Sequence, residues 1–477
     1  MEIGARIIHG LKVSVVLRFF AQAMVWACTL LLVRILNPDD YGLMAMSLLF
    51  VGIINMISDA GLGRLIVHTE NLSDRLIAQS FTLNLLWSIL LFLGLFLLAP
   101  LISDFFHEPR LTVLIRIVAC QHLIVIFHTL PNGLSIRRMQ FFQREVIQGS
   151  AMLGSALVTL GLALSGYGVW SLVIGYLFLK MIQVSGLLFL NPIFFPVTTD
   201  FSDFRPTVAH YSIRVMLNDV FRYLYLSLPS VCIGHILNKT QLGFFSVARN
   251  LSSLPGDKMG EIMTSLGWSS FSRLQNKPEV AGAYLLKSIQ LASGILFPVY
   301  FGMAAVAPEI VYLLFSEKWL PMVIPFQLLA LCGPWRLYTE IIGTAATAAG
   351  YPERTARVLL GSLIMMLLVV PATAWGISGV SVACVMIGIA SFMIHSRGLL
   401  PLFGLTARQI LCAMMPGGIS ALIMVGFVFG AREFMEPFLD IGILLLGLII
   451  TGVVIYSVVL RCLFPNYCIV IKNYLRH

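Results

Sequence analysis

The densest group of polar and ionisable residues in this otherwise apolar chain lies between residues 207 and 235. With 100° between successive residues of a helix, several of its side chains fall within an arc of about 80°. They are Tyr211, Arg214, Asn218, Arg222 and Tyr225, and Asp219 lies about 60° beyond Arg222. A charged group in hydrocarbon costs about 2.5–3.5 kcal/mol on insertion scales, so this face must border protein or water.

Smaller polar sets interrupt other apolar stretches. They comprise Arg18 and Gln22 in 11–34, Asp59 in 41–60, Arg249, Asp257 and Glu261 in 241–265, and Arg336 and Glu340 in 321–348. We expect a kink or local unwinding at Pro255, because proline removes a backbone donor. For Arg336 and Glu340, spaced i,i+4, local pairing along one helix is an alternative to a role at a site.

Together these residues predict a water-filled cavity with a cationic wall. Arginine suits phosphate there, because its planar guanidinium stays charged and binds two phosphate oxygens at once. The candidate substrate-binding residues are Arg18, Gln22, Tyr211, Arg214, Asn218, Arg222, Tyr225 and Arg249, with Arg336 and Glu340 as further candidates. The pattern favours an anionic, phosphorylated cargo.

Membrane-spanning helices must position these side chains. The 477 residues are 58% hydrophobic and 11% charged, with a mean hydropathy of +0.92. Apolar runs reach the roughly 20 residues needed to cross a bilayer, and strand-like alternation is absent. We therefore expect an all-α polytopic membrane protein. Hydropathy and turn signals predict fourteen helices, at 11–34, 41–60, 80–102, 111–130, 146–165, 168–190, 207–235, 241–265, 281–305, 321–348, 356–374, 377–398, 408–430 and 440–461.

The chain also repeats itself. Residues 35–42, ILNPDDYG, return as 236–243, ILNKTQLG, and GYGVWS at 166–171 returns more weakly as GISGVS at 376–381. An even number of predicted spans separates the copies, which indicates two like-oriented six-helix lobes with a site between them. The predicted parts are an N-terminal lobe, 1–195, a C-terminal lobe, 196–400, and a final helix pair with a cytoplasmic tail, 401–477.

The net charge of +9 is distributed as a membrane topology requires. If the N-terminus is cytoplasmic, most lysines and arginines fall in cytoplasmic segments and many acids fall outside, which predicts that both termini are cytoplasmic. This distribution argues against a nucleic-acid partner. The cysteines and histidines lack metal-site spacing and no Walker-type motif occurs, so we expect no metal and no cofactor.

Two motifs resemble those of a known family. LVRILNPDDYG at 32–42, followed by DAGLG at 59–63, is similar to the opening signature of bacterial polysaccharide flippases, and GYGVWS at 166–171 is similar to a turn of the same family. On these residues the chain is identified as a member of the polysaccharide transporter family of Wzx-type flippases, nearest to the colanic acid exporters. That family belongs to the MOP superfamily, which also holds the MATE exporters and the lipid II flippases.

The resemblance implies two lobes around a central cavity and alternating access. It implies a flippase that moves an undecaprenyl-diphosphate-linked oligosaccharide across the bacterial inner membrane for exopolysaccharide, capsule or O-antigen synthesis. Cationic cavity residues would hold the diphosphate, and the final helix pair would hold the lipid tail. Candidate ion-coupling residues are Asp59, Asp219, Asp257 and Glu261. Membrane lipid, a polysaccharide polymerase and a chain-length regulator are the further expected partners.

Two other functions are weighed against this one. A multidrug or small-molecule exporter of the same fold would offer acids and aromatic rings to a cation, whereas arginines dominate the candidate residues here. A membrane-embedded glycan ligase would need a large outer loop and a catalytic constellation. No loop here is long enough for a folded soluble domain, so we expect a transporter and not an enzyme.

Overall fold

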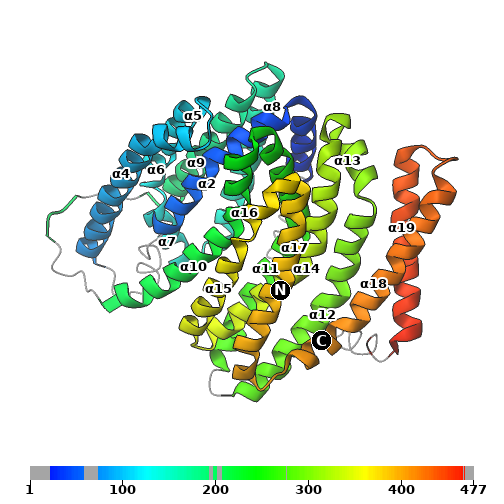
Figure 1. The fold of residues 1–477 in the computed structure, drawn as a ribbon. Coiled ribbons are helices and arrows are strands. Elements are labelled where there is room, and N and C mark those ends of the chain that lie inside the picture. Colours follow the sequence, from blue (N-terminus) through cyan, green and yellow to red (C-terminus); the bar gives the residue numbers. More distant parts are fainter. Residues whose placement is uncertain are drawn as a thin grey trace, which may run out of the picture. The chain divides into compact units, whose positions relative to one another are not determined.

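The computed structural model describes residues 22–58, 73–192, 197–200, 207–274, 277–465 and 467, apart from the side chains of 56–58, 207–219, 261–270, 272 and 273. All regular structure in this part of the chain is helical (Figure 1). The chain divides into two compact units, 1–216 and 217–477, which are described separately. The predicted division at 195 and 400 remains a prediction.

The first unit contains the helix Gln22–Ile35 and seven labelled helices before the boundary helix α10 (Thr207–Cys232). They are α2 (Pro38–Ser58), α4 (Asp74–Phe105), α5 (Arg110–Ala119), α6 (Gln121–Val125), α7 (Thr129–Arg137), α8 (Phe141–Leu164) and α9 (Val169–Leu190).

The second unit takes up the end of α10 and continues through a π-helical turn, η1 (Ile233–Leu237). Its longer helices are α11 (Lys239–Arg273), α12 (Pro278–Ala305), α13 (Ala307–Phe315), α14 (Val323–Ala348), α15 (Pro352–Met366), α17 (Gly376–Leu399), α18 (Ala407–Met435) and α19 (Ile441–Leu463). Short turns connect them: η2 (Glu317–Met322), α16 (Val369–Ala372), η3 (Thr373–Trp375) and η4 (Leu400–Phe403).

The helices have the length and composition of membrane spans. Among the described residues, nine helical runs are long and apolar enough to cross a bilayer, or ten if the bent pair Arg110–Val125 and Thr129–Arg137 is one span. One of the nine, Pro352–Phe403, folds back on itself, because Ser391 Oγ bonds Ser362 Oγ at 2.8 Å. The predicted all-α polytopic fold is confirmed for the described chain, and the count of fourteen spans stays a prediction.

The duplicated turn builds the same helix start twice. In the second copy, the Asn238 side chain caps α11 by accepting from the Gln241 backbone N–H at 2.9 Å. In the first copy, the Asp40 carboxylate accepts from the Asn37 backbone N–H at 3.0 Å. Asp40 and Gln241 hold the same position, so each copy forms one of the two bonds of a capping box.

The repeat extends to how the helices pack. In the first unit, α2 packs against α4, α5 and α9, and α8 packs against α9. In the second unit, the counterpart α11 packs against α12, α14 and α17, and α15 packs against α17. The sequence repeat is therefore also a structural repeat. The final pair, α18 and α19, lies outside this pattern and packs against α12 (Figure 1).

Several helices differ from the prediction: α13 was not expected, and the expected helix 356–374 is α15 followed by the short turns α16 and η3. The expected helix 111–130 is three helices, α5, α6 and α7, with a bend of 45° between the α5–α6 run and α7. Pro131 lies in the first turn of α7, where its missing N–H is tolerated, and so favours a new helix start there. Asn84 Nδ2 donates to the Ile126 carbonyl at 2.9 Å, which satisfies backbone freed at the break.

The expected unwinding at Pro255 is wrong, because α11 runs unbroken from Lys239 to Arg273. Side chains on both sides of the proline are tied to neighbouring helices. Arg249 binds α10, and Asp257 binds Arg336 of α14. These contacts hold the helical path although one backbone hydrogen bond is lost.

Candidate functional site

A pocket opens within the second unit among five of its helices. Its cavity volume is about 70 Å³, smaller than the roughly 300–1,000 Å³ of typical ligand pockets. Its lining comes from α10 (Tyr225, Leu226, Pro229), α11 (Phe245, Arg249, Ser252, Ser253), α14 (Leu329, Cys332, Gly333, Arg336), α15 (Met366) and α17 (Cys384). Two arginines thus stand in a largely apolar wall.

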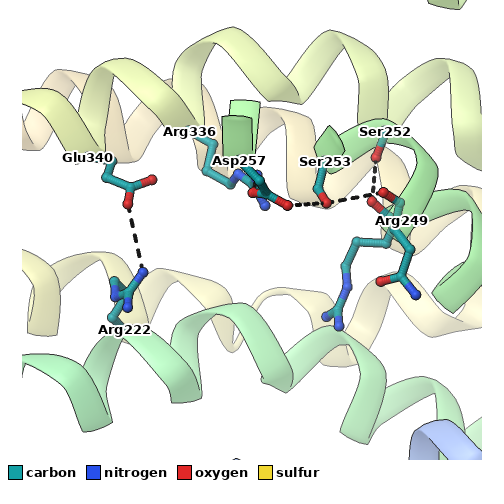
Figure 2. A network of polar contacts seen from close by, with 8 residues as sticks. Arg222, Arg249, Ser252, Ser253, Asp257, Arg336 and Glu340 are labelled. Carbon is teal, nitrogen blue, oxygen red and sulfur yellow. Dashed lines mark hydrogen bonds and ion pairs between the residues drawn. The ribbon is translucent and has the colours of Figure 1, made fainter. Parts of the chain in front are cut away.

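Arg336 forms the tightest ion pair of this pocket. Its Nη2 lies 2.7 Å from Asp257 Oδ1, and Ser253 Oγ donates to the other carboxylate oxygen at 2.6 Å (Figure 2). The Arg336 side chain is 28% exposed and that of Asp257 is 55% exposed. The pair joins α14 to α11 while remaining accessible from outside the protein.

A second, looser ion pair involves Glu340, one turn further along α14. Its Oε1 lies 3.8 Å from Arg222 Nη1 on α10 (Figure 2). The alternative of a local Arg336–Glu340 pair is wrong, because each of these side chains reaches a different helix. α14 therefore pairs its glutamate with an arginine of α10 and its arginine with an aspartate of α11.

Arg249 has a different environment from Arg222 and Arg336. Its Nη1 donates to the Leu226 carbonyl at 2.9 Å and to Ser230 Oγ at 3.1 Å. Both partners flank Pro229, where the proline ring disturbs the hydrogen bonding of α10. Arg249 therefore supports the backbone of α10 as well as lining the pocket.

Tyr300 of α12 is completely buried and packs close to the helix segments that carry Arg336 and Asp257. A Cβ at Gly333 would lie 2.1 Å from the Tyr300 ring, and one at Gly256 would lie 2.4 Å from its hydroxyl oxygen. The Tyr300 side chain therefore occupies space that a side chain at Gly333 or Gly256 would fill. Sequence analysis missed Tyr300, since a lone tyrosine in an apolar span carries no spacing signal.

The structure brings together six of the candidate residues in the second unit: Arg222, Tyr225, Arg249, Asp257, Arg336 and Glu340. Gln22 is exposed on the helix Gln22–Ile35 of the first unit. The other candidates fall outside what the structure describes. Arg18 and Asp59 lie outside the described residues, and the side chains of Tyr211, Arg214, Asn218, Asp219 and Glu261 lie outside the described side chains.

The first unit holds a polar cluster that sequence analysis also missed. The fully buried Gln121 of α6 donates to Asn55 Oδ1 at 3.2 Å and accepts from the Tyr176 hydroxyl at 2.5 Å. The buried ring of His122 lies beside it. Two neutral amides and a tyrosine hydroxyl on three separate helices show no linear motif, so only the fold brings them together. No group of three or more metal-ligating side chains is found in either unit, as far as the chain is described.

Residues 31–324, more than half of the chain, match a family model described as polysaccharide biosynthesis protein. The chain belongs to this polysaccharide biosynthesis protein family. The membership confirms the resemblance that the turn motifs carry.

Two curated relatives of this family member come from bacterial polysaccharide pathways. The succinoglycan biosynthesis transport protein ExoT of Rhizobium meliloti is 26% identical over 61% of this chain and 58% of its own length. The lipopolysaccharide biosynthesis protein WzxC of Escherichia coli is 23% identical over 73% of this chain and 71% of its own.

Solved structures share the fold of this polysaccharide biosynthesis protein. The lipid II flippase MurJ in an inward closed conformation aligns with a TM-score of 0.77 and 13% identity, over 95% of this chain and 99% of MurJ. An inward-facing multidrug MATE transporter of the MOP superfamily aligns with a TM-score of 0.58 and 17% identity, over 82% and 95%. The predicted MurJ- and MATE-like architecture is confirmed.

Proposed function

We propose that this polysaccharide biosynthesis protein is a flippase for a lipid-diphosphate-linked oligosaccharide, with undecaprenyl diphosphate as the carrier. The observation that supports it most directly is the arginine-lined pocket of the second unit. Membership of the family, the name of the relative ExoT as a transport protein and the MurJ-like fold support the same cargo class.

The charges of the pocket suit a diphosphate better than a cation. Two arginines, Arg249 and Arg336, line the pocket. Together with Arg222 and the two carboxylates that pair with Arg336 and Arg222, Asp257 and Glu340, they carry a net charge of 3 − 2 = +1. Guanidinium groups bind phosphate oxygens in pairs and stay charged in an apolar wall. A pocket for a cationic drug would need the opposite balance, which argues against the multidrug exporter.

The cellular setting follows from the same proposal. The protein would lie in the bacterial inner membrane with both termini in the cytoplasm, as the positive-inside distribution indicates. It would carry its cargo by alternating access without changing it chemically. A polysaccharide polymerase and a chain-length regulator would receive the flipped product.

The proposal is tested by replacing Arg222 and Arg336 together with alanine. In inverted vesicles loaded with lipid-linked oligosaccharide, we expect the translocation rate to fall at least about tenfold, the effect of removing about 1.4 kcal/mol of cargo binding. The matched control is Arg354→Ala, an exposed arginine of α15 in the same unit. Equal rates in all three proteins would contradict the proposal, and drug resistance without glycan transport would favour the exporter.

A further inference from the structure

The arginines that a diphosphate would need are already occupied by the protein's own carboxylates. Asp257 holds Arg336 at 2.7 Å and Glu340 holds Arg222 at 3.8 Å. Among the described residues, neither arginine has a second ion-pair partner. A guanidinium group has five N–H donors, so a cargo phosphate competes with each carboxylate for the donors that face it.

We infer that Asp257 and Glu340 are positioning residues that stand in for the cargo's phosphates. In the empty pocket they hold Arg336 and Arg222 in place, and a bound diphosphate displaces them. This inference rests on the proposed function and assigns these two acids a role in binding and release. It makes each round of binding an exchange of one anion for another.

The chemistry of the two anions allows such an exchange. A carboxylate and a phosphate present the same acceptor oxygens to a guanidinium group, and the phosphate carries more charge. Exposed ion pairs are weak, since water solvates both partners once they separate. Asp257 is 55% exposed and Glu340 is 38% exposed, so each displaced carboxylate remains hydrated.

A third ion pair in the same unit shows what a permanent pair looks like. Arg432 of α18 binds both carboxylate oxygens of Glu309 on α13, at 2.6 and 2.7 Å, and also donates to the Ala305 carbonyl. Its side chains are 17% and 6% exposed. Separating this buried pair would leave uncompensated charge, which costs far more than opening an exposed one.

The two stand-in carboxylates differ in how firmly they are held. Asp257 accepts a hydrogen bond from Ser253 at 2.6 Å, within its own helix α11. This bond gives the carboxylate a second anchor whether or not it contacts Arg336. Glu340 lies at the longer distance and has no such bond in the described structure. We therefore expect Glu340 to be displaced first.

The test measures binding of sugar-free undecaprenyl diphosphate to the full chain in phosphatidylethanolamine nanodiscs. Removing an internal competitor raises the fraction of the binding-competent state. We expect Glu340→Gln to bind about threefold tighter, and Asp257→Asn with Glu340→Gln about tenfold tighter, with slower dissociation. Glu340→Asp should retain near wild-type affinity, because it keeps the charge.

The control is Glu279→Gln, an exposed acid in the first turn of α12 that removes the same charge away from the pocket. Its affinity should equal that of the wild type. Unchanged or weaker binding in variants with a wild-type melting temperature would overturn the inference, because the acids would then be structural. If the wild type binds no diphosphate, or if Arg222→Ala with Arg336→Ala binds as well as wild type, the proposed function itself fails.

Discussion

Arg249 and Arg222 are both arginines of the pocket unit, yet their surroundings divide their roles. Arg249 Nη1 donates hydrogen bonds to the Leu226 carbonyl and to Ser230 Oγ, on either side of Pro229. Arg222 is half-exposed, and among the described side chains its ion-pair partner is Glu340 at 3.8 Å. Arg249 therefore supports backbone, whereas Arg222 is the one we propose for cargo binding.

This difference predicts that the same substitution affects stability at Arg249 but not at Arg222. Arg249→Met should lower the free energy of unfolding by about 1–3 kcal/mol, because a carbonyl in an apolar setting loses its donor. Arg222→Met should change it by less than about 0.5 kcal/mol while reducing transport. Thermal unfolding in detergent, followed by tryptophan fluorescence, compares the two. Equal losses of stability would contradict the division.

At the residue scale the sequence singled out charged residues that the structure brings together, but it did not predict their partners. Arg222, Arg249, Asp257, Arg336 and Glu340 were all candidates, since a charge within an apolar run needs a reason. Their pairing across helices depends on which helices become neighbours. Spacing along one helix suggested a local Arg336–Glu340 pair, and the fold formed two long-range pairs instead.

Two prolines within helices, Pro100 and Pro298, are supported by donors from other helices. Pro100 of α4 leaves the Phe96 carbonyl without its helical donor, and Arg116 of α5 donates to it at 3.4 Å. Pro298 of α12 likewise leaves the Gly294 carbonyl without its helical donor. The Tyr456 hydroxyl of α19 donates to that carbonyl at 2.8 Å. In hydrocarbon, such borrowed donors are what make a proline tolerable.

Close helix packing gives a prediction for one glycine of α18. A Cβ at Gly417 would lie 2.6 Å from the Ser293 carbonyl oxygen of α12. Gly417→Ala should therefore lower the free energy of unfolding by about 1–3 kcal/mol, since backbone must shift. Gly426→Ala on the same helix has nothing within 4 Å and should be neutral or stabilising. Melting temperatures compare the variants, and equal values would disprove this close contact.

At the scale of elements, the apolar runs located nearly every helix but not its continuity. The sequence predicted a kink or local unwinding at Pro255, where α11 is continuous, and no break at 111–130, where α5, α6 and α7 are separate. Continuity depends on whether neighbours supply donors and anchors at a weak point. Those neighbours are distant in sequence, so local composition does not reveal them.

The whole chain is built from one packing scheme used twice. The helices of each unit pack in corresponding pairs, and α18 and α19 are added to α12 of the second unit only. The echo of ILNPDDYG and ILNKTQLG was enough to predict this duplication. The dense polar group at 207–235 predicted that charges gather in the second half. The neutral cluster of Gln121, Asn55 and Tyr176 in the first unit was not predicted.

The proposed topology makes a prediction about the ends of the chain. An even number of spans with basic cytoplasmic loops puts both termini in the cytoplasm. Green fluorescent protein fused after His477 should fluoresce, whereas alkaline phosphatase fused there should be inactive. A fusion at the outer loop near Glu436, between α18 and α19, should give the reverse pattern. An active phosphatase at His477 would contradict the topology.

The order of charges along α14 also fixes how that helix can slide. Arg336 faces Asp257 and Glu340, one turn on, faces Arg222. A slip of one turn in one direction would set Arg336 against Arg222, and a slip in the other would set Glu340 against Asp257. Like charges brought together repel, so both shifted registers are less favourable, although exposure to solvent weakens the effect. The four residues thus favour one axial position of α14 relative to Asp257 of α11 and Arg222 of α10.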